Sequence, residues 1–108
     1  MTDVVTKFYQ GYLAPSGTNI TGVAPAATNF TIKHMVFSKV GAASASIACG
    51  YNNIAISSNY IMPSGIVIGA GEWAESTDIY VLNAGDSLFA AASVSGTITA
   101  TVHGVTST

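Results

Sequence analysis

The side chains that could carry out acid–base chemistry lie close together in one segment of the chain. Glu72, Glu75 and Asp78 form the only cluster of acids, and Trp73 is the only tryptophan. Two such carboxylates could act as the acid–base pair of a glycoside hydrolase, or their oxygens could bind calcium. The D-x-D-x-D spacing and closing Glu of a calcium loop are absent. We therefore interpret the segment as an acidic loop that faces solvent or a partner protein.

Zinc binding or nucleophilic catalysis would have to use the two histidines and the single cysteine. His34, Cys49 and His103 are far apart in the sequence and lack the paired ligand spacing of a zinc site. Cys49 has no basic neighbour in sequence to stabilise a thiolate, and no G-x-S-x-G segment holds a serine nucleophile. We therefore predict no metal, no cofactor and no catalytic residue. We expect His34 to be hydrogen-bonded in the core or an interface, and His103 to lie on the threonine-rich face of the last strand.

The segment Ile66–Ala74 formally fits a dinucleotide-binding fingerprint, a strand followed by G-x-G-x-x-[GA]. In that motif the glycines let the backbone approach a pyrophosphate at the N-terminus of a helix. Residues 72–82 have no helical pattern, and they bring acids beside the site where the phosphates would lie. We therefore interpret Gly69-Ala70-Gly71 as a turn between two strands.

Charged residues are too few and too unevenly placed for a domain that is alone in water. They make up 7% of the chain, against about 25% in an ordinary globular domain, and none lies between Lys39 and Glu72. A solitary domain keeps an interspersed charged surface to stay dissolved and monomeric. We infer that much of the surface faces other protein, which favours a structural or binding role over an enzymatic one.

The same composition argues against several kinds of partner and site. The chain has no arginine and only three lysines, so it could not neutralise the phosphates of a nucleic acid. The N-terminus does not resemble a signal peptide, and no apolar stretch reaches the roughly 18 residues of a membrane span. We therefore expect a cytosolic origin and no membrane partner. A single cysteine also allows no intrachain disulfide.

Strand patterns extend over nearly the whole chain and predict one all-β domain over residues 1–108. About eight strands with turn signals between them are typical of an antiparallel β-sandwich, of which the jelly roll is one form. The clearest strand is the last, where Ile98, Ala100 and Val102 alternate with threonines. The segment Ala90–Ala92 is the nearest candidate for a helix, but its neighbours favour a strand.

The segment Thr28–Val40 breaks the regular alternation of a strand. Its residues His34-Met35-Val36-Phe37 place apolar side chains on both faces. Such a strand is either central and covered on both sides, or it carries a bulge that shifts the register.

Two neighbouring segments supply the residues that could anchor a contact with another protein. The charge-free segment contributes aromatic and large apolar side chains, and the acidic segment after it adds charge and the tryptophan. The candidate interface residues are Tyr51, Tyr60, Ile61, Met62, Glu72, Trp73 and Glu75.

The two signs of charge are also separated along the chain. Lys7, Lys33 and Lys39 lie in the first forty residues, whereas most acids lie in the second half. Copies arranged head to tail could pair a basic edge with an acidic edge and so fix the register of a cyclic oligomer. We expect a homo-oligomer, with a trimer as one candidate form.

The segment Ile79–Leu88 enters a turn at Ala84-Gly85-Asp86, a strand of small residues follows, and Gly96–Val105 closes the chain with a strand that ends in glycine and an apolar residue. This order resembles small β-sandwich virion proteins of tailed bacteriophages, which have the same A-G-D turn, small-residue strand and closing strand. Asn29–Val40 and Ala42–Cys49 look like the central strand and the hairpin after it. The V-P-A-G-T segment usual near the start is replaced here by Ala14-Pro15-Ser16-Gly17-Thr18.

This resemblance implies a non-enzymatic structural part of the virion, made in the bacterial host. A capsid decoration (cement) protein that oligomerises and binds the major capsid protein is favoured, because the chain has no fibre-like repeat. The alternative is a minor tail or tail-tip component that contacts tail proteins and binds host glycan. A carbohydrate-binding module built on Trp73 and nearby tyrosines, and a small hydrolase using Glu72 or Glu75, are the other hypotheses. Glycan binding is disfavoured, because aromatic residues in sheets more often pack or anchor interfaces.

Overall fold

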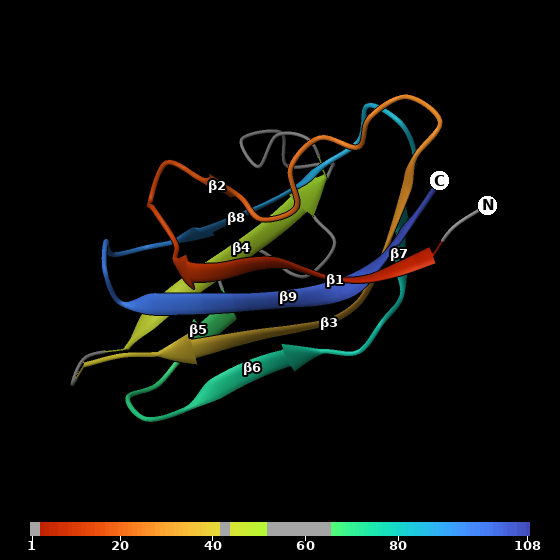
Figure 1. Ribbon diagram of the computed structural model, residues 1–108. Coiled ribbons are helices and arrows are strands. Elements are labelled where there is room, and N and C mark those ends of the chain that lie inside the picture. Colours follow the sequence, from red (N-terminus) through yellow and green to blue (C-terminus); the bar gives the residue numbers. More distant parts are fainter. Residues whose placement is uncertain (1–2, 42–43, 52–65) are drawn as a thin grey trace.

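The protein is all-β over the residues that the computed structural model describes, which are 3–41, 44–51 and 66–108 (Figure 1). Nine strands in this part of the chain form two antiparallel sheets that pack together, so the predicted β-sandwich is confirmed. Within the described ranges there is no helix long and apolar enough to cross a bilayer.

The larger sheet, sheet A, has β9 and β3 at its centre, and β1 lies at one edge. The other edge is made by β6 and β7 in succession, because both pair with β3. This edge is therefore interrupted between Ser76 and Tyr80. The strands of sheet A are β1 (Asp3–Tyr12), β3 (Asn29–Lys39), β6 (Trp73–Ser76), β7 (Tyr80–Leu82) and β9 (Ile98–Ser107).

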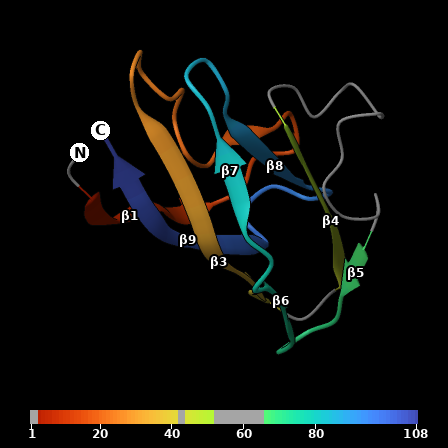
Figure 2. The same cartoon turned by 90° about the vertical axis from the view of Figure 1, so that its right-hand side faces the viewer.

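The smaller sheet, sheet B, has the strand order β2-β8-β4-β5. Figure 2 shows β4 and β5 on one side of the molecule and β1, β9 and β3 on the other. Both edge strands of sheet B, β2 and β5, are short. The strands of sheet B are β2 (Thr18–Asn19), β4 (Ala45–Tyr51), β5 (Ile66–Ile68) and β8 (Leu88–Ala92).

The core lies between the two sheets and follows the alternation seen in the sequence. Ile98, Ala100 and Val102 of β9 are fully buried, as the period of two predicts. From sheet B, alternate residues of β4 and β8 are buried against them, and Ala90–Ala92 belongs to a strand as favoured. The buried residues of these two strands are Ala45, Ile47, Cys49, Leu88, Ala90 and Ala92.

A bulge explains the irregular pattern in β3. Phe30 and Ile32 are buried, the register with β9 shifts at Lys33, and Met35 and Phe37 are then buried with the opposite parity. The extra residue therefore keeps both halves of the strand facing the same core. Of the two predicted alternatives, a bulge that shifts the register is therefore the one that the structure shows.

The strands of sheet A bend together at one position along their length, and Figures 1 and 2 show the bend in β9. The register of β1 against β9 shifts between Lys7 and Tyr9, opposite His103 and Val102, and the shift in β3 lies opposite His103 and Gly104. A β-carbon at Gly104 would overlap the carbonyl oxygen of Thr31 on β3. Two bulges and one close backbone approach therefore form the bend.

The glycine-rich segment that resembles a dinucleotide fingerprint is a turn, as predicted. It joins β5 to β6, and the N–H of Glu72 donates to the carbonyl of Gly69 at 3.0 Å. Gly71 has φ 74°, a left-handed conformation that glycine adopts at low cost. Because a strand follows the turn, no helix N-terminus is present there to hold a phosphate.

Candidate functional site

The charged side chains are segregated between the two sheets. The described strands of sheet B carry no Asp, Glu, Lys, Arg or His. The charged residues within strands belong to sheet A, and the remaining three, Glu72, Asp78 and Asp86, lie in the connections. The scarcity of charge in the sequence is thus a spatial asymmetry in the fold.

The outer side of sheet B is a surface of small or apolar residues, here named the uncharged face. Its side chains alternate with the buried residues of β4 and β8, and they are partly or fully exposed. Val67 of the edge strand β5 is 68% exposed, which is high for an apolar side chain. The uncharged face comprises Ser46, Ala48, Val67, Phe89, Ala91 and Ser93.

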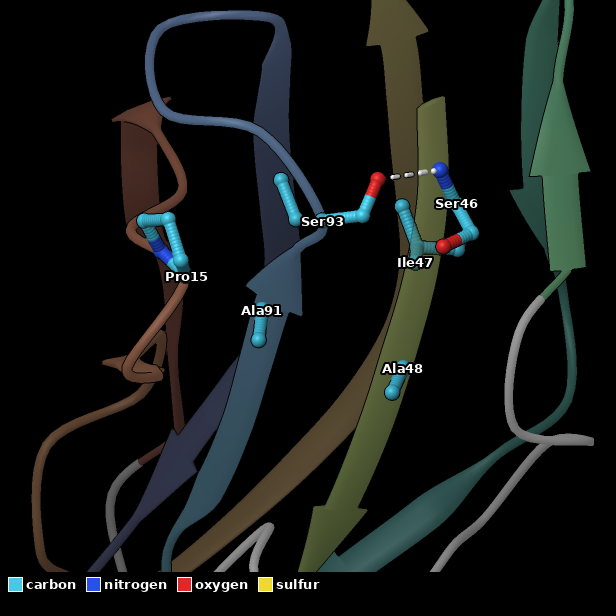
Figure 3. Close-up of a pocket in the computed structure, with 7 residues that line it drawn as sticks. Pro15, Ser46, Ile47, Ala48, Ala91 and Ser93 are labelled. Atoms are coloured by element: carbon cyan, nitrogen blue, oxygen red, sulfur yellow. Dashed lines mark hydrogen bonds between the residues drawn. The ribbon is translucent and has the colours of Figure 1, made fainter. Parts of the chain in front are cut away.

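A shallow hollow of about 170 Å³ lies within the uncharged face (Figure 3). Pro15, in the loop after β1, forms one side, and Ala48 and Ala91 line it from neighbouring strands. The N–H of Ser46 donates to the hydroxyl oxygen of Ser93 at 2.9 Å, which fixes the other side. The lining has no titratable group, so the hollow offers shape and small size to a partner rather than acid–base chemistry.

The outer side of sheet A, here named the polar face, is different. The strand register places Lys7, His103 and His34 at one level across β1, β9 and β3. Towards the other end of the sheet, the register forms a row of Tyr12, Thr99, Ser38 and Trp73. A further row, between this one and the row of Lys7, consists of Gln10, Thr101, Val36 and Glu75. This face is therefore rich in hydrogen-bonding groups and carries exposed aromatic rings near two edges.

One polar contact links the edge strand β6 of sheet A to the central strand β3. His34 Nε2 and Glu75 Oε2 lie 2.8 Å apart, and their side chains are 39% and 49% exposed. His34 is hydrogen-bonded as predicted, but it lies on the outer face and not in the core. An exposed pair of this kind stabilises a fold by at most about 1 kcal/mol. His103 is exposed on the outer, threonine-bearing face, as predicted.

The acidic segment is not the loop that we predicted. Glu75 lies within β6 and pairs with Val36 of β3, because the segment completes the edge of sheet A. Glu72 and Asp78 lie in the connections on either side, and all three acids are exposed. Trp73 is 68% exposed on the polar face. The segment thus presents acids and an aromatic ring on a strand.

The described residues contain no group of three His, Cys, Asp or Glu side chains that could hold a metal ion. Cys49 is buried in the core, and burial raises the pKa of its thiol from 9.0 to about 12. Desolvation disfavours the thiolate, so this cysteine stays protonated at neutral pH.

Tyr51 was also a candidate interface residue, but its ring packs against another strand of the same molecule. Tyr51, at the end of β4, makes an edge-to-face contact with Tyr80 of β7, with ring centroids 6.4 Å apart. Its pKa is raised, first by burial and then by Tyr80. Tyr51 thus joins sheet B to sheet A within the molecule. Tyr60, Ile61 and Met62 lie outside the described residues.

Of the three lysines expected to form a basic edge, only Lys7 lies on an edge strand, because Lys33 and Lys39 belong to the central strand β3. Lys39 is 7% exposed, and its ammonium donates to the carbonyl of Val40. It has the same parity as Met35 and Phe37 beyond the bulge of β3, so it lies on the buried side. The burial of Lys39 could have been predicted from the sequence, because a bulge was one of the two explanations for the pattern of this strand. A bulge puts Lys39 on the same side as Met35 and Phe37. Lys7 and Lys33 are exposed.

An exposed apolar group beyond the bend of sheet A was not predicted from the sequence. Val5 of β1 is 86% exposed, and the register aligns it with Val105 of β9 and, across β3, with Val81 of β7, which is 53% exposed. Val4 is 54% exposed. No sequence pattern distinguishes these valines from buried ones, because their exposure depends on the place of β1 at the edge.

The geometry therefore gives two unlike faces and one exposed strand edge. Among known proteins, no family model matches this sequence, and no curated protein or solved structure is significantly similar to it.

Proposed function

We propose that the protein is a non-enzymatic structural component of a tailed-phage virion, a decoration protein that forms homo-oligomers and binds the assembled capsid. The observation that carries the proposal is the uncharged face of sheet B. The resemblance of residues 79–105 to small virion β-sandwiches supplies the kind of particle.

The uncharged face suits a permanent contact for two physical reasons. Covering it requires no charge to be taken out of water, which is the costly part of burying a polar surface. Its alanines and serines also lose little side-chain entropy when a partner packs on them. A protein that binds only the assembled lattice stabilises that state by mass action, and this is how a decoration protein would strengthen a capsid.

The second candidate is a tail or tail-tip component that binds host glycan. The specific observation in its favour is the row on the polar face that begins at Tyr12 and ends at Trp73, both more than half exposed. Aromatic rings give sugars an apolar surface, and the hydroxyls of Thr99 and Ser38 lie between the two rings in this row.

Charge insertion on the uncharged face tests the first candidate. In co-sedimentation with expanded capsids of the phage that encodes the chain, we expect Ala48→Glu and Ala91→Glu each to abolish binding. Thr101→Glu, which places the same charge on the polar face, is the matched control and should bind like the unmodified protein. Thermal unfolding confirms that each variant is folded.

Capsid binding that survives both alanine substitutions would contradict the proposal. A glycan array then examines the second candidate. Binding that is lost on Trp73→Ala but kept in Ala48→Glu would assign the protein to glycan recognition at the tail.

A further inference from the structure

The edge of sheet A formed by β1 is unusually open. β1 has ten residues and pairs on one side with β9, and no strand of the described residues pairs with its other side. Val4 and Val5, near its start, are 54% and 86% exposed. A long edge strand with exposed apolar side chains is a template for pairing with another chain.

The features that normally protect an edge are confined to the second half of β1. The bulge lies between Lys7 and Tyr9, and a bulge and a lysine both discourage strand addition. Asp3–Thr6 has no bulge, no proline and no lysine. The unprotected part is therefore a straight segment that ends at Lys7.

We propose that two copies of the chain associate through this segment, with the two β1 strands antiparallel and centred on Val5. In this register Val5 lies opposite Val5 of the second copy. Asp3 lies opposite Lys7 of the second copy, and Lys7 opposite its Asp3. Because Asp3, Val5 and Lys7 share one face of the strand, the two valines meet between two pairs of opposite charges.

Other arrangements of the same edge lose this complementarity. A parallel pairing in register would bring like charges side by side at Asp3 and at Lys7. A shift of one residue would place side chains of opposite faces against each other, and a shift of two would move both charges off their partners. Pairing of β1 with the opposite edge of sheet A would meet two strands of four and three residues, β6 and β7, with a break between them.

This inference deepens the proposed function and rests on that part of it in which copies of the chain associate. It uses the edge of sheet A, so the uncharged face of sheet B stays free for the particle. It also makes the contact two-fold, because the same segment serves both copies.

Cysteine cross-linking tests the register directly. Directly opposed residues of antiparallel strands have Cα atoms about 4.5–5.5 Å apart, within the range of a disulfide. Under mild oxidation we expect Val5→Cys to form a covalent dimer. Val67→Cys, also at a highly exposed valine of an edge strand, is the control. It should form dimer at least about tenfold more slowly, because its thiols lack the high effective concentration of a paired site. Buried Cys49 does not compete.

A charge exchange tests the same register without a covalent bond. Asp3→Lys and Lys7→Asp each place like charges opposite one another, and we expect each to weaken the dimer about tenfold by native mass spectrometry. The double variant Asp3→Lys/Lys7→Asp restores both pairs and should regain the original dimer fraction. Thermal unfolding of each monomer separates weakened pairing from loss of the fold.

The outcomes separate the inference from the proposed function. Equal cross-linking of Val5→Cys and Val67→Cys, failure of the double variant to recover, or a protein that is only monomeric or only trimeric would each overturn the β1 pairing. If capsid binding and its loss in Ala48→Glu persist in that case, the proposed function stands and only the pairing fails. If Val5→Cys cross-links but no capsid binding is found, the pairing stands and the virion role fails.

Discussion

Gly104 is the residue on which the bend of sheet A most directly depends. Its lack of a side chain lets the backbone of β9 approach Thr31 of β3 more closely than any other residue would allow. The requirement is steric, because Gly104 has no positive φ. The backbone itself would have to move to admit a β-carbon.

We expect Gly104→Ala to lower the free energy of unfolding by about 3 kcal/mol, at the upper end of overpacking costs, because rigid backbone is in the way. Gly11→Ala is the matched control in β1 of the same sheet. There the new β-carbon would meet only the end of the Tyr9 side chain, at 3.2 Å, so the expected change is about 1 kcal/mol or less. Urea unfolding measures both. Equal effects of the two substitutions would show that the close approach is not what makes Gly104 necessary.

Cys49 predicts a pH dependence of stability. Its pKa is about 12 in the folded protein and 9.0 when unperturbed, so above pH 9 the unfolded chain loses a proton that the folded chain keeps. Stability from this group is fully present below pH 9 and falls as the pH rises towards 12. Between about pH 8 and 10 we expect the unmodified protein to lose about 1.4 kcal/mol relative to Cys49→Ala. Denaturant unfolding at several pH values measures the difference, and parallel curves for the two proteins would contradict the assignment.

The predicted burial of individual residues was correct where it depends on the alternation of a single strand. The burial of Ile98, Ala100 and Val102 follows from the alternation of β9 alone. Gly104 could not be recognised, because its role depends on a neighbouring strand that is distant in the sequence. Lys39 was grouped with Lys7 and Lys33 by its place in the sequence alone, which does not reveal that it lies on the buried side of β3.

Among the elements, β3 shows how one residue determines the packing of a whole strand. The bulge at Lys33 lets the strand present Phe30 and Ile32 before it, and Met35 and Phe37 after it, to one core. The side chain of Lys33 is exposed, so its position in the chain matters more than its chemistry.

We therefore expect deletion of Lys33 to prevent folding, whereas Lys33→Ala changes stability by about 0.5 kcal/mol or less. The deletion would turn either Ile32 or Met35, with the residues beyond it, towards solvent. Far-UV circular dichroism and thermal unfolding compare the two variants. A deletion variant that unfolds cooperatively near the original temperature would contradict the role of the bulge.

The longer strands were predictable, and the short ones depended on their partners. The pattern of the sequence predicted β3 and β9, because strands of 11 and 10 residues are long enough to show where their side chains alternate. β6 was taken for a loop, since four residues with two acids nearby contain no periodic signal and form a strand only because β3 offers an open edge. The polar face could not be foreseen either, because it combines residues from four strands through their register.

For the whole molecule, the main feature is the separation of an uncharged face from a polar face. The sequence indicated that charge was missing, but only the fold shows that it is missing from the strands of one entire sheet. The candidate contact was placed in the segment from Lys39 to Glu72, and the described part of that segment supplies two strands of this sheet.

This separation predicts how binding responds to salt. Contacts between exposed charges are screened over about 10 Å at 0.1 M salt and over about 3 Å at 1 M, whereas apolar contacts are not weakened in this way. We expect capsid binding to persist from about 0.1 M to about 1 M NaCl. Co-sedimentation across that range, with Thr101→Glu as the control, measures it. A loss of binding of tenfold or more, about 1.4 kcal/mol, would point to the polar face as the contact.

The lengths of the edge strands determine whether association can continue without limit. β2 and β5 have two and three residues, and the edge made by β6 and β7 is interrupted, so none of these edges offers a continuous ladder for an amyloid-like stack. Among the described edge strands only β1 is long, and a two-fold pairing would occupy the straight segment that precedes its bulge. Association through β1 would therefore stop at a closed dimer and would not continue into a fibre. This would hold even if a chain with so little charge reached a high local concentration in a cell.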